Sequence, residues 1–200
     1  MKRGITVGAL AIVLFACRGD DPAPVMVSAS NDVPVHVDSI FPNAEQIRRF
    51  KAARNGAAAS ELSGGALSRD ALVDNLRSAL QQQDTSGLRA LLLTPAEFID
   101  LYYPTSMYAR PPYTQSPEIT WLLIEQNSKK GMHRLLERLG GAWPGIESYS
   151  CSARARVEGA NRLWEECIVR LQDNDTGQRV FGSILEHGGR YKFLSYTNDF

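Results

Sequence analysis

The sequence predicts an α+β protein in which N-terminal helices pack against a bent antiparallel sheet of at least four strands. Up to residue 139, apolar side chains recur at intervals of three and four, which is typical of amphipathic helices. From residue 148 onward, polar and apolar side chains alternate in short runs between turn residues, which is typical of strands. Because the helices precede the strands instead of alternating with them, we expect an α+β arrangement.

The first 16 residues predict an export signal. Lys2 and Arg3 precede an uncharged apolar run that is shorter than the ~20 residues needed to span a bilayer. The run ends in Leu14-Phe15-Ala16-Cys17, which resembles the lipobox of bacterial lipoproteins. The resemblance implies that Cys17 receives diacylglycerol, that the chain is cleaved before it, and that the new amino group is acylated, for example with palmitate. The alternative is an ordinary cleaved signal peptide.

The chain is expected to divide into a signal peptide at 1–16, a flexible tether at 17–38, a short helix and linker at 39–66, and an α+β domain at 67–200. Pro22, Pro24 and Pro34 predict an extended tether. With lipid on Cys17, we expect a protein held on the extracytoplasmic side of a bacterial envelope membrane. With or without the lipid, an export signal leads to a compartment where disulfides persist.

Local start and stop signals place the first two helices. Pro42 falls in the first turn of a short helix that Gly56 ends. Ser68 is a favourable N-cap for a second helix, which we expect to end near Gln83. The small residues at 57–65 predict a linker between the two.

Two further helices follow. Thr94 and Glu97 form a capping box, and the helix that they start runs to about Tyr103. Ser116 caps the longest helix, which ends at a pair of glycines. We expect its glycine at 131 to kink or split it. Its buried stripe is predicted to consist of Ile119, Leu122, Leu123, Met132, Leu135, Leu136 and Leu139.

Residues 148–171 predict a β-hairpin with one cysteine on each arm. The register that matches polarity on both faces places Cys151 opposite Cys167, Tyr149 opposite Val169, Ala155 opposite Leu163 and Ser152 opposite Glu166. In an exported chain this register predicts a disulfide between Cys151 and Cys167. The alternative is a pair of free buried thiols.

Further strands and turns complete the sheet. Asp173-Asn174-Asp175-Thr176-Gly177 begins like a calcium-binding loop, but it lacks the final glutamate and predicts a tight turn instead. Val180–Leu185 and Tyr191–Tyr196 predict two more strands. They are joined across His187, which we expect to be exposed.

The C-terminal segment Gly189-Arg190-Tyr191-Lys192-Phe193-Leu194-Ser195-Tyr196 is similar to the last strand of many nuclear-transport-factor-2-like, or SnoaL-like, domains. The order of elements from Ser68 to Phe200 resembles this family too. The resemblance implies a cone in which a strongly bent sheet wraps a long helix and leaves a pocket at its open end. The proline-rich loop between Pro104 and Pro117 departs from the shortest members. Because the family includes isomerases, cyclases, dehydratases and domains without known chemistry, the resemblance does not select a function.

Charge and motif content argue against several function classes. Lys and Arg together number 22, as do Asp and Glu, so no basic face for nucleic acid is indicated. His36, His133 and His187 are scattered. His133 and Glu137 are spaced for two ligands on a helix face, but a surface contact is the preferred interpretation. We expect no metal and no cofactor, since the sequence also lacks phosphate-loop, Gly-x-Ser-x-Gly and Cys-x-x-Cys motifs.

Glu165 is the carboxylate that interrupts the apolar pattern of the return strand. It alternates with Leu163 and Cys167, so it would point to the apolar side of the sheet, where burial raises a carboxyl pKa. The preferred interpretation is that this end of the hairpin already meets solvent. The aromatic residues predicted to line a pocket mouth are Tyr102, Tyr103, Tyr108, Tyr113 and Trp121.

Three functions are compatible with these patterns. We expect a non-catalytic binding domain, anchored to the membrane through Cys17, whose ligand is a small apolar molecule or another envelope protein. A SnoaL-type pocket enzyme, similar to an isomerase, cyclase or hydrolase, would use Glu165 with a tyrosine or histidine. An interaction module would dock a partner through the aromatic loop Tyr102–Tyr113.

The anchor is tested by the mass of the protein purified from membranes. We expect the N-terminal peptide to begin at Cys17 and to carry a lipid-sized mass increment, which Cys17→Ser abolishes. A mature chain in which Cys17 is present but unmodified would reduce the prediction to simple secretion.

Overall fold

The computed structural model describes residues 41–54, 56–141, 145–172 and 174–197. The predicted signal peptide and tether lie outside the described residues, as do Cys17, His36 and Asp173. The helical elements are α1 (Asn43–Ala53), α2 (Arg69–Gln81), α3 (Thr85–Ala90), α4 (Pro95–Glu97), the π-helical turn η1 (Phe98–Tyr102), the 3₁₀ turns η2 (Tyr103–Thr105) and η3 (Met107–Ala109), and α5 (Pro117–Leu139). The strands are β1 (Ile146–Ser150), β2 (Arg156–Glu158), β3 (Asn161–Trp164), β4 (Ile168–Leu171), β5 (Asn174–Gln178), β6 (Ile184–His187) and β7 (Arg190–Phe193).

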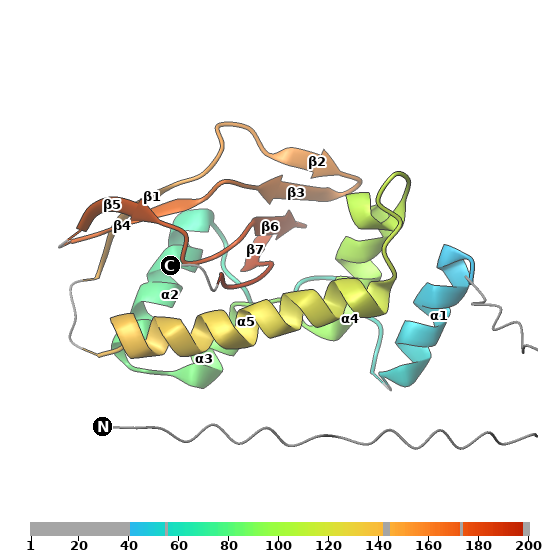
Figure 1. Ribbon diagram of the computed structural model, residues 1–200, viewed down its shortest axis with the longest axis horizontal. Coiled ribbons are helices and arrows are strands. Elements are labelled where there is room, and N and C mark those ends of the chain that lie inside the picture. Colours follow the sequence, from blue (N-terminus) through green and yellow to red (C-terminus); the bar gives the residue numbers. More distant parts are fainter. Residues whose placement is uncertain (1–40, 55, 142–144, 173, 198–200) are drawn as a thin grey trace, which may run out of the picture. The chain divides into compact units, whose positions relative to one another are not determined.

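The predicted α+β class is confirmed. A four-stranded antiparallel sheet has the order β2-β3-β6-β7, and a three-stranded antiparallel sheet has the order β1-β4-β5. Figure 1 shows the strands on one side of the long helix α5. The last two strands are shorter than predicted, because β6 starts at Ile184 and β7 ends at Phe193. The predicted tight turn is wrong for residues 174–177, because they belong to β5.

The helix start signals act as the sequence predicts. Ser68 accepts a hydrogen bond from the backbone of Ala71, and Ser116 accepts one from Ile119. Thr94 and Glu97 make both hydrogen bonds of a capping box. The helix that they start widens into the π-helical turn η1 after three residues.

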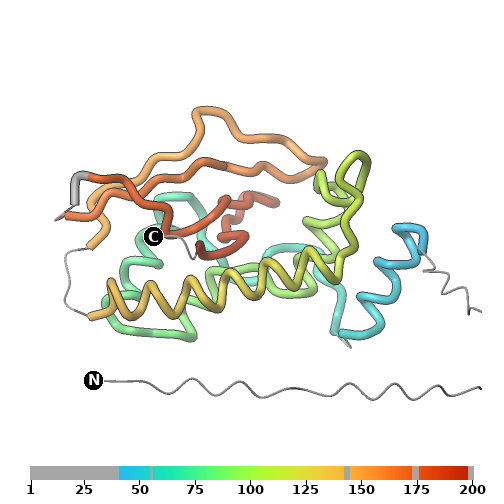
Figure 2. Tube along the Cα trace, in the orientation of Figure 1, coloured from blue at the N-terminus to red at the C-terminus, as the bar shows by residue number. Residues whose placement is uncertain are grey.

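The long hairpin is interrupted in its middle. Tyr149 lies opposite Val169, as predicted, but Leu163 lies opposite Arg156 and not Ala155. The backbone N–H of Ser152 donates to the carbonyl of Glu165 at 2.8 Å, so Ser152 is not paired with Glu166. The first arm has one residue more than the second between the paired stretches, and Glu166 takes a left-handed conformation with φ of 53°. Such a bulge bends the strands, and it divides the hairpin into β1-β4 and β2-β3 (Figure 2).

The predicted disulfide between Cys151 and Cys167 is confirmed. It joins the arms within the interrupted stretch, where backbone pairing is sparse. Cys167 is 2% exposed and packs in the core. The covalent bond therefore holds the two arms together where ladder hydrogen bonds are few.

Two clusters of buried side chains form the core. The larger one joins α2 and α5 to the strands and includes Leu72, Leu76, Leu135, Val169 and Phe193. The smaller one is aromatic and centres on Phe98, whose ring lies 5.2–6.1 Å from those of Phe50, Tyr102, Tyr103 and Trp121.

The predicted buried stripe of α5 is wrong in its first half. Ile119, Leu122 and Leu123 are 48%, 42% and 48% exposed. Trp121 is buried instead, because it packs against the Phe98 ring. Gly131 does not kink the helix; a Cβ there would overlap the carbonyl of Thr197, so its lack of a side chain permits close contact with the C-terminal segment. In the second half of α5, Met132, Leu135 and Leu139 are buried as predicted, whereas Leu136 is half-buried.

A buried ion pair links α4 to β7. The Lys192 ammonium lies 3.0 Å from both carboxylate oxygens of Glu97, and both side chains are at most 2% exposed. Glu97 also accepts from the Ser63 backbone at 2.6 Å, the Ser63 hydroxyl at 2.8 Å and the Thr94 backbone at 2.7 Å. Burial by itself would raise the pKa of Glu97, but these donors and the Lys192 charge bring it below its usual value.

This network predicts a specific pattern of stability. Lys192→Met is expected to lower the free energy of unfolding by about 3–5 kcal/mol, because it leaves a buried carboxylate uncompensated. Glu97→Gln in the same chain is expected to recover part of that loss, as urea unfolding of the two single variants and the double variant measures. Additive losses in the double variant would contradict the coupling.

The same pair predicts a pH dependence. The lowered pKa of Glu97 contributes stability that is present above the unfolded glutamate pKa of about 4.3 and is lost as pH falls through the folded value. The stability difference between the wild type and Lys192→Met should therefore shrink below about pH 4. A difference that is constant across this range in acid unfolding would contradict the ion pair.

Candidate functional site

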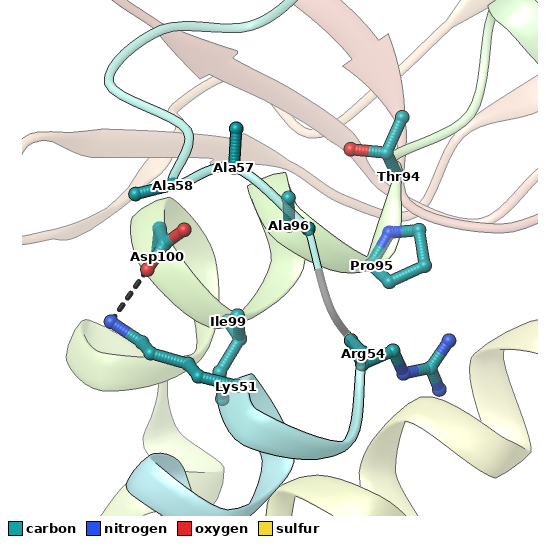
Figure 3. A pocket seen from close by; sticks show the side chains of 10 residues that line it. Lys51, Arg54, Ala57, Ala58, Thr94, Pro95, Ala96, Ile99 and Asp100 are labelled. Carbon is teal, nitrogen blue, oxygen red and sulfur yellow. Dashed lines mark ion pairs between the residues drawn. The ribbon is translucent and has the colours of Figure 1, made fainter.

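Two neighbouring pockets lie on the helical side of the domain and share Thr94 and Pro95 as a common wall. The first pocket has a volume of about 360 Å³ and is shown in Figure 3. It is lined by Lys51, Arg54, Gly56, Ala57, Ala58, Thr94, Pro95, Ala96, Ile99 and Asp100. The second pocket has a volume of about 430 Å³. It is lined by Arg89, Leu92, Leu93, Thr94, Pro95, Trp121, Ile124, Glu125, Ser128, Lys129, Met132 and Leu194.

The shared wall is held in place by the buried network. Thr94 and Pro95 are the N-cap and first residue of α4, and the capping box that they begin ends in Glu97. The ion pair of Glu97 with Lys192 fixes that turn to β7. A rigid, preformed wall of this kind favours a binding pocket over a transient gap between loops.

The first pocket contains an ion pair at one end. Lys51 and Asp100 lie 2.5 Å apart, and Asp100 also accepts from the Ala59 backbone at 2.9 Å. The predicted linker at 57–65 is thereby fixed to η1. Figure 3 shows the Arg54 guanidinium extending away from this pair. Its central carbon lies 4.7 Å from the centre of the Phe50 ring and 5.3 Å from that of Trp121.

The second pocket is mostly apolar, and two of the residues that line it carry a buried polar group without a hydrogen-bond partner. These groups are the indole N–H of Trp121 and the hydroxyl of Ser128, and each residue is 6% exposed. Both residues belong to α5, seven positions apart, so they lie on the same face of the helix. A buried donor without a partner costs about 1–3 kcal/mol, which a ligand acceptor would recover.

The charges around the two pockets do not cancel. Lys129 pairs with Glu125 at 3.2 Å, and Lys51 pairs with Asp100. Arg54 and Arg89 lie within ion-pair distance of no carboxylate among the residues that the structure describes. The lining is therefore net positive.

The structure separates the five predicted pocket aromatics. Tyr102 and Tyr103 are 1% exposed and belong to the aromatic core. Burial, followed by the Glu118 charge, raises the pKa of Tyr103 to about 12, and burial raises that of Tyr102 as well. Tyr108 is half-buried against the same cluster, and Tyr113 is 58% exposed. Of the five, Trp121 lines one of the two pockets.

Glu165 is held in an ion pair. Its two carboxylate oxygens accept from Nε and Nη2 of Arg156, each at 2.9 Å, and its side chain is 36% exposed. The one-residue difference between the hairpin arms brings Arg156 to this position. Arg156 also pairs with Glu158, whose side chain is 1% exposed and accepts from the Met107 backbone at 3.0 Å. Glu165 thus occupies a partly solvated, charge-compensated site, unlike a general acid in an apolar pocket.

His133 and His187 lie apart from the two pockets. His133 and Glu137 form an exposed contact of 3.1 Å, as the preferred interpretation predicts. His187 is half-buried, not exposed as predicted, because its Nδ1 lies 2.8 Å from the side-chain oxygen of buried Asn161. Within the described ranges, no three His, Cys, Asp or Glu side chains gather as metal ligands would. None of the helices in those ranges is long and apolar enough to cross a membrane.

Sequence reasoning missed Arg54, Arg89 and Ser128 as pocket residues. Ser128 carried a signal, because it follows Trp121 by two helical turns on a face that is otherwise buried. Arg54 and Arg89 carried none, since surface arginines are common and their neighbours come from distant segments.

Comparisons with known proteins do not assign this chain to a family. It matches no protein-family model, no curated protein and no solved structure at a significant level.

The two carboxylates that contact Arg156 are expected to differ in importance. Glu165→Gln should lower the free energy of unfolding by about 1 kcal/mol or less, because its ion pair is partly solvated. Glu158→Gln should cost about 1–3 kcal/mol, since it weakens a buried network. Urea unfolding measures both, with exposed Glu147→Gln on β1 as the control. A greater loss for Glu165→Gln would indicate that Glu165 is the structurally dominant partner.

Proposed function

We propose that this chain is an exported bacterial envelope protein, anchored through lipid on Cys17, whose domain binds a small apolar ligand in the second pocket without transforming it. The observation that carries the binding proposal is the pair of buried, unpartnered donors of Trp121 and Ser128 in an apolar pocket. An apolar pocket with a few polar groups is the usual form of a small-molecule site.

The pocket has the dimensions and composition for this role. Its volume of about 430 Å³ lies in the ~300–1,000 Å³ range of ligand pockets. Leu93 and Trp121 are more than nine-tenths buried and give it firm apolar walls. Met132 adds an adaptable thioether side chain to the lining.

The export and anchoring part of the proposal rests on sequence features. They are the charged start, the short apolar run and the lipobox-like Leu14-Phe15-Ala16-Cys17. The disulfide between Cys151 and Cys167 supports it, because disulfides persist in oxidising compartments outside the cytoplasm. A nuclear-transport-factor-2-like relationship is part of the same proposal, supported by the element order and the bent sheet.

Binding is tested by calorimetry with dodecanol on the full exported chain carrying Cys17→Ser, so that no acyl group of its own competes. We expect saturable binding of one molecule per chain. Ser128→Leu should weaken it tenfold or more, because the larger side chain fills the pocket.

Gln126→Leu is the matched control, because Gln126 lies on the exposed face of α5 two positions away. It adds the same side chain outside the pocket and should leave binding unchanged. No saturable binding, or equal weakening by Ser128→Leu and Gln126→Leu, would refute the second pocket as the site.

A further inference from the structure

We infer that the ligand is an amphiphile with an anionic head, whose apolar tail fills the second pocket and whose head lies at the boundary of the two pockets, against Arg54. This inference rests on the proposed function. It adds the chemical class of the ligand and a specificity-determining residue.

The first argument is the position of Arg54. This residue caps the C-terminal end of α1 and lines the first pocket. Its guanidinium lies over the rings of Phe50 and Trp121, which position the cation through cation–π contact. The same plane carries several N–H donors, and a carboxylate or phosphate accepts from two of them at once. No carboxylate of the described residues occupies that role.

The second argument is the proximity of Arg54 to an unpartnered donor. The Arg54 guanidinium lies over the Trp121 ring, and the indole N–H of Trp121 has no hydrogen-bond partner. Because Trp121 lines the second pocket and Arg54 lines the first, their contact joins the linings of the two pockets, which also share Thr94 and Pro95. A head group at this boundary would bring its oxygens to both donors, whereas a purely apolar ligand would leave the indole unsatisfied.

The third argument is charge complementarity. Lys51 is neutralised by Asp100, and Lys129 is neutralised by Glu125. The positive excess of the lining therefore comes from Arg54 and Arg89. Arg89 lines the second pocket and adds to the positive potential there. An anion in a partly buried site of this kind is attracted, while a cationic amphiphile is rejected.

The class is tested with three probes of equal tail length: dodecanoate, dodecyl phosphate and dodecanol. In calorimetry on the Cys17→Ser chain, at least one anionic probe should bind tenfold or more tightly than dodecanol. Arg54→Gln should abolish this preference while leaving dodecanol affinity within about twofold. Trp121→Phe, which keeps the ring and removes the N–H, should weaken the preferred anion several-fold.

Arg134→Gln is the charge-matched control, because Arg134 is exposed on α5 and lines neither pocket. It should leave the preference intact. Unfolding curves of each variant separate lost binding from lost folding.

The outcomes separate the two proposals. Equal binding of all three probes, or a preference that survives Arg54→Gln in a folded chain, overturns the anionic head and leaves the apolar pocket standing. Absence of binding by all three overturns both. The two anionic chemistries are told apart by acid: preference for dodecanoate should vanish as the carboxyl is protonated near pH 4–5, whereas preference for dodecyl phosphate should persist there.

Discussion

One buried carboxylate, that of Glu97, connects the parts of this domain that form the candidate site. It accepts hydrogen bonds from the α4 N-cap, from Ser63 in the segment before α2 and from Lys192 on β7. Burying two charges is costly, and the cost is offset only when the pair is close and its remaining hydrogen-bonding sites are filled. Here every carboxylate oxygen has donors, so the network favours one arrangement of three distant segments. The wall between the two pockets is the start of α4, and this network sets its position.

The strand that carries Lys192 is supported on its outer edge as well. Ala66 exchanges two backbone hydrogen bonds with Tyr191, and Phe193 donates to the carbonyl of Leu91. These contacts cover part of an edge that would otherwise present free backbone groups. The segments on either side of α2 and α3 are thereby pinned to the same strand, which leaves the pocket wall little freedom to shift.

The hairpin shows how a single extra residue changes the chemistry of a sheet. The extra residue on the first arm shifts the strand register by one residue, so that Arg156 lies opposite Leu163. In this position Arg156 pairs with Glu165. The disulfide lies in the same irregular stretch, so covalent and ionic links together replace the missing ladder bonds. Regular alternation would have directed the Glu165 carboxylate toward the apolar face of the sheet. It is instead neutralised by Arg156 in a partly solvated position.

The rotation of α5 about its axis decides what the second pocket contains. Trp121 packs on Phe98, and Gly131 lets the C-terminal segment approach closely, so the helix turns Ser128 inward. The same rotation leaves Ile119, Leu122 and Leu123 on the outside. In the first half of α5, the face marked by the apolar residues is therefore not the face that this domain buries.

The sequence by itself determined what depends on near neighbours. The caps at Ser68, Thr94 and Ser116 follow from side chains that bond backbone groups within three residues, and such motifs need no tertiary partner. The α+β class and the cysteine pair follow from element order and strand polarity in the same way. Only the tertiary structure decided the rest of the site. It set the one-residue register shift of the hairpin, the Glu97–Lys192 pair and the contact of Arg54 with Trp121, all of which depend on segments that are far apart in the chain. Alternation and helical period specify which residues share a face, but only the packing of other elements determines which face is buried and what it meets there.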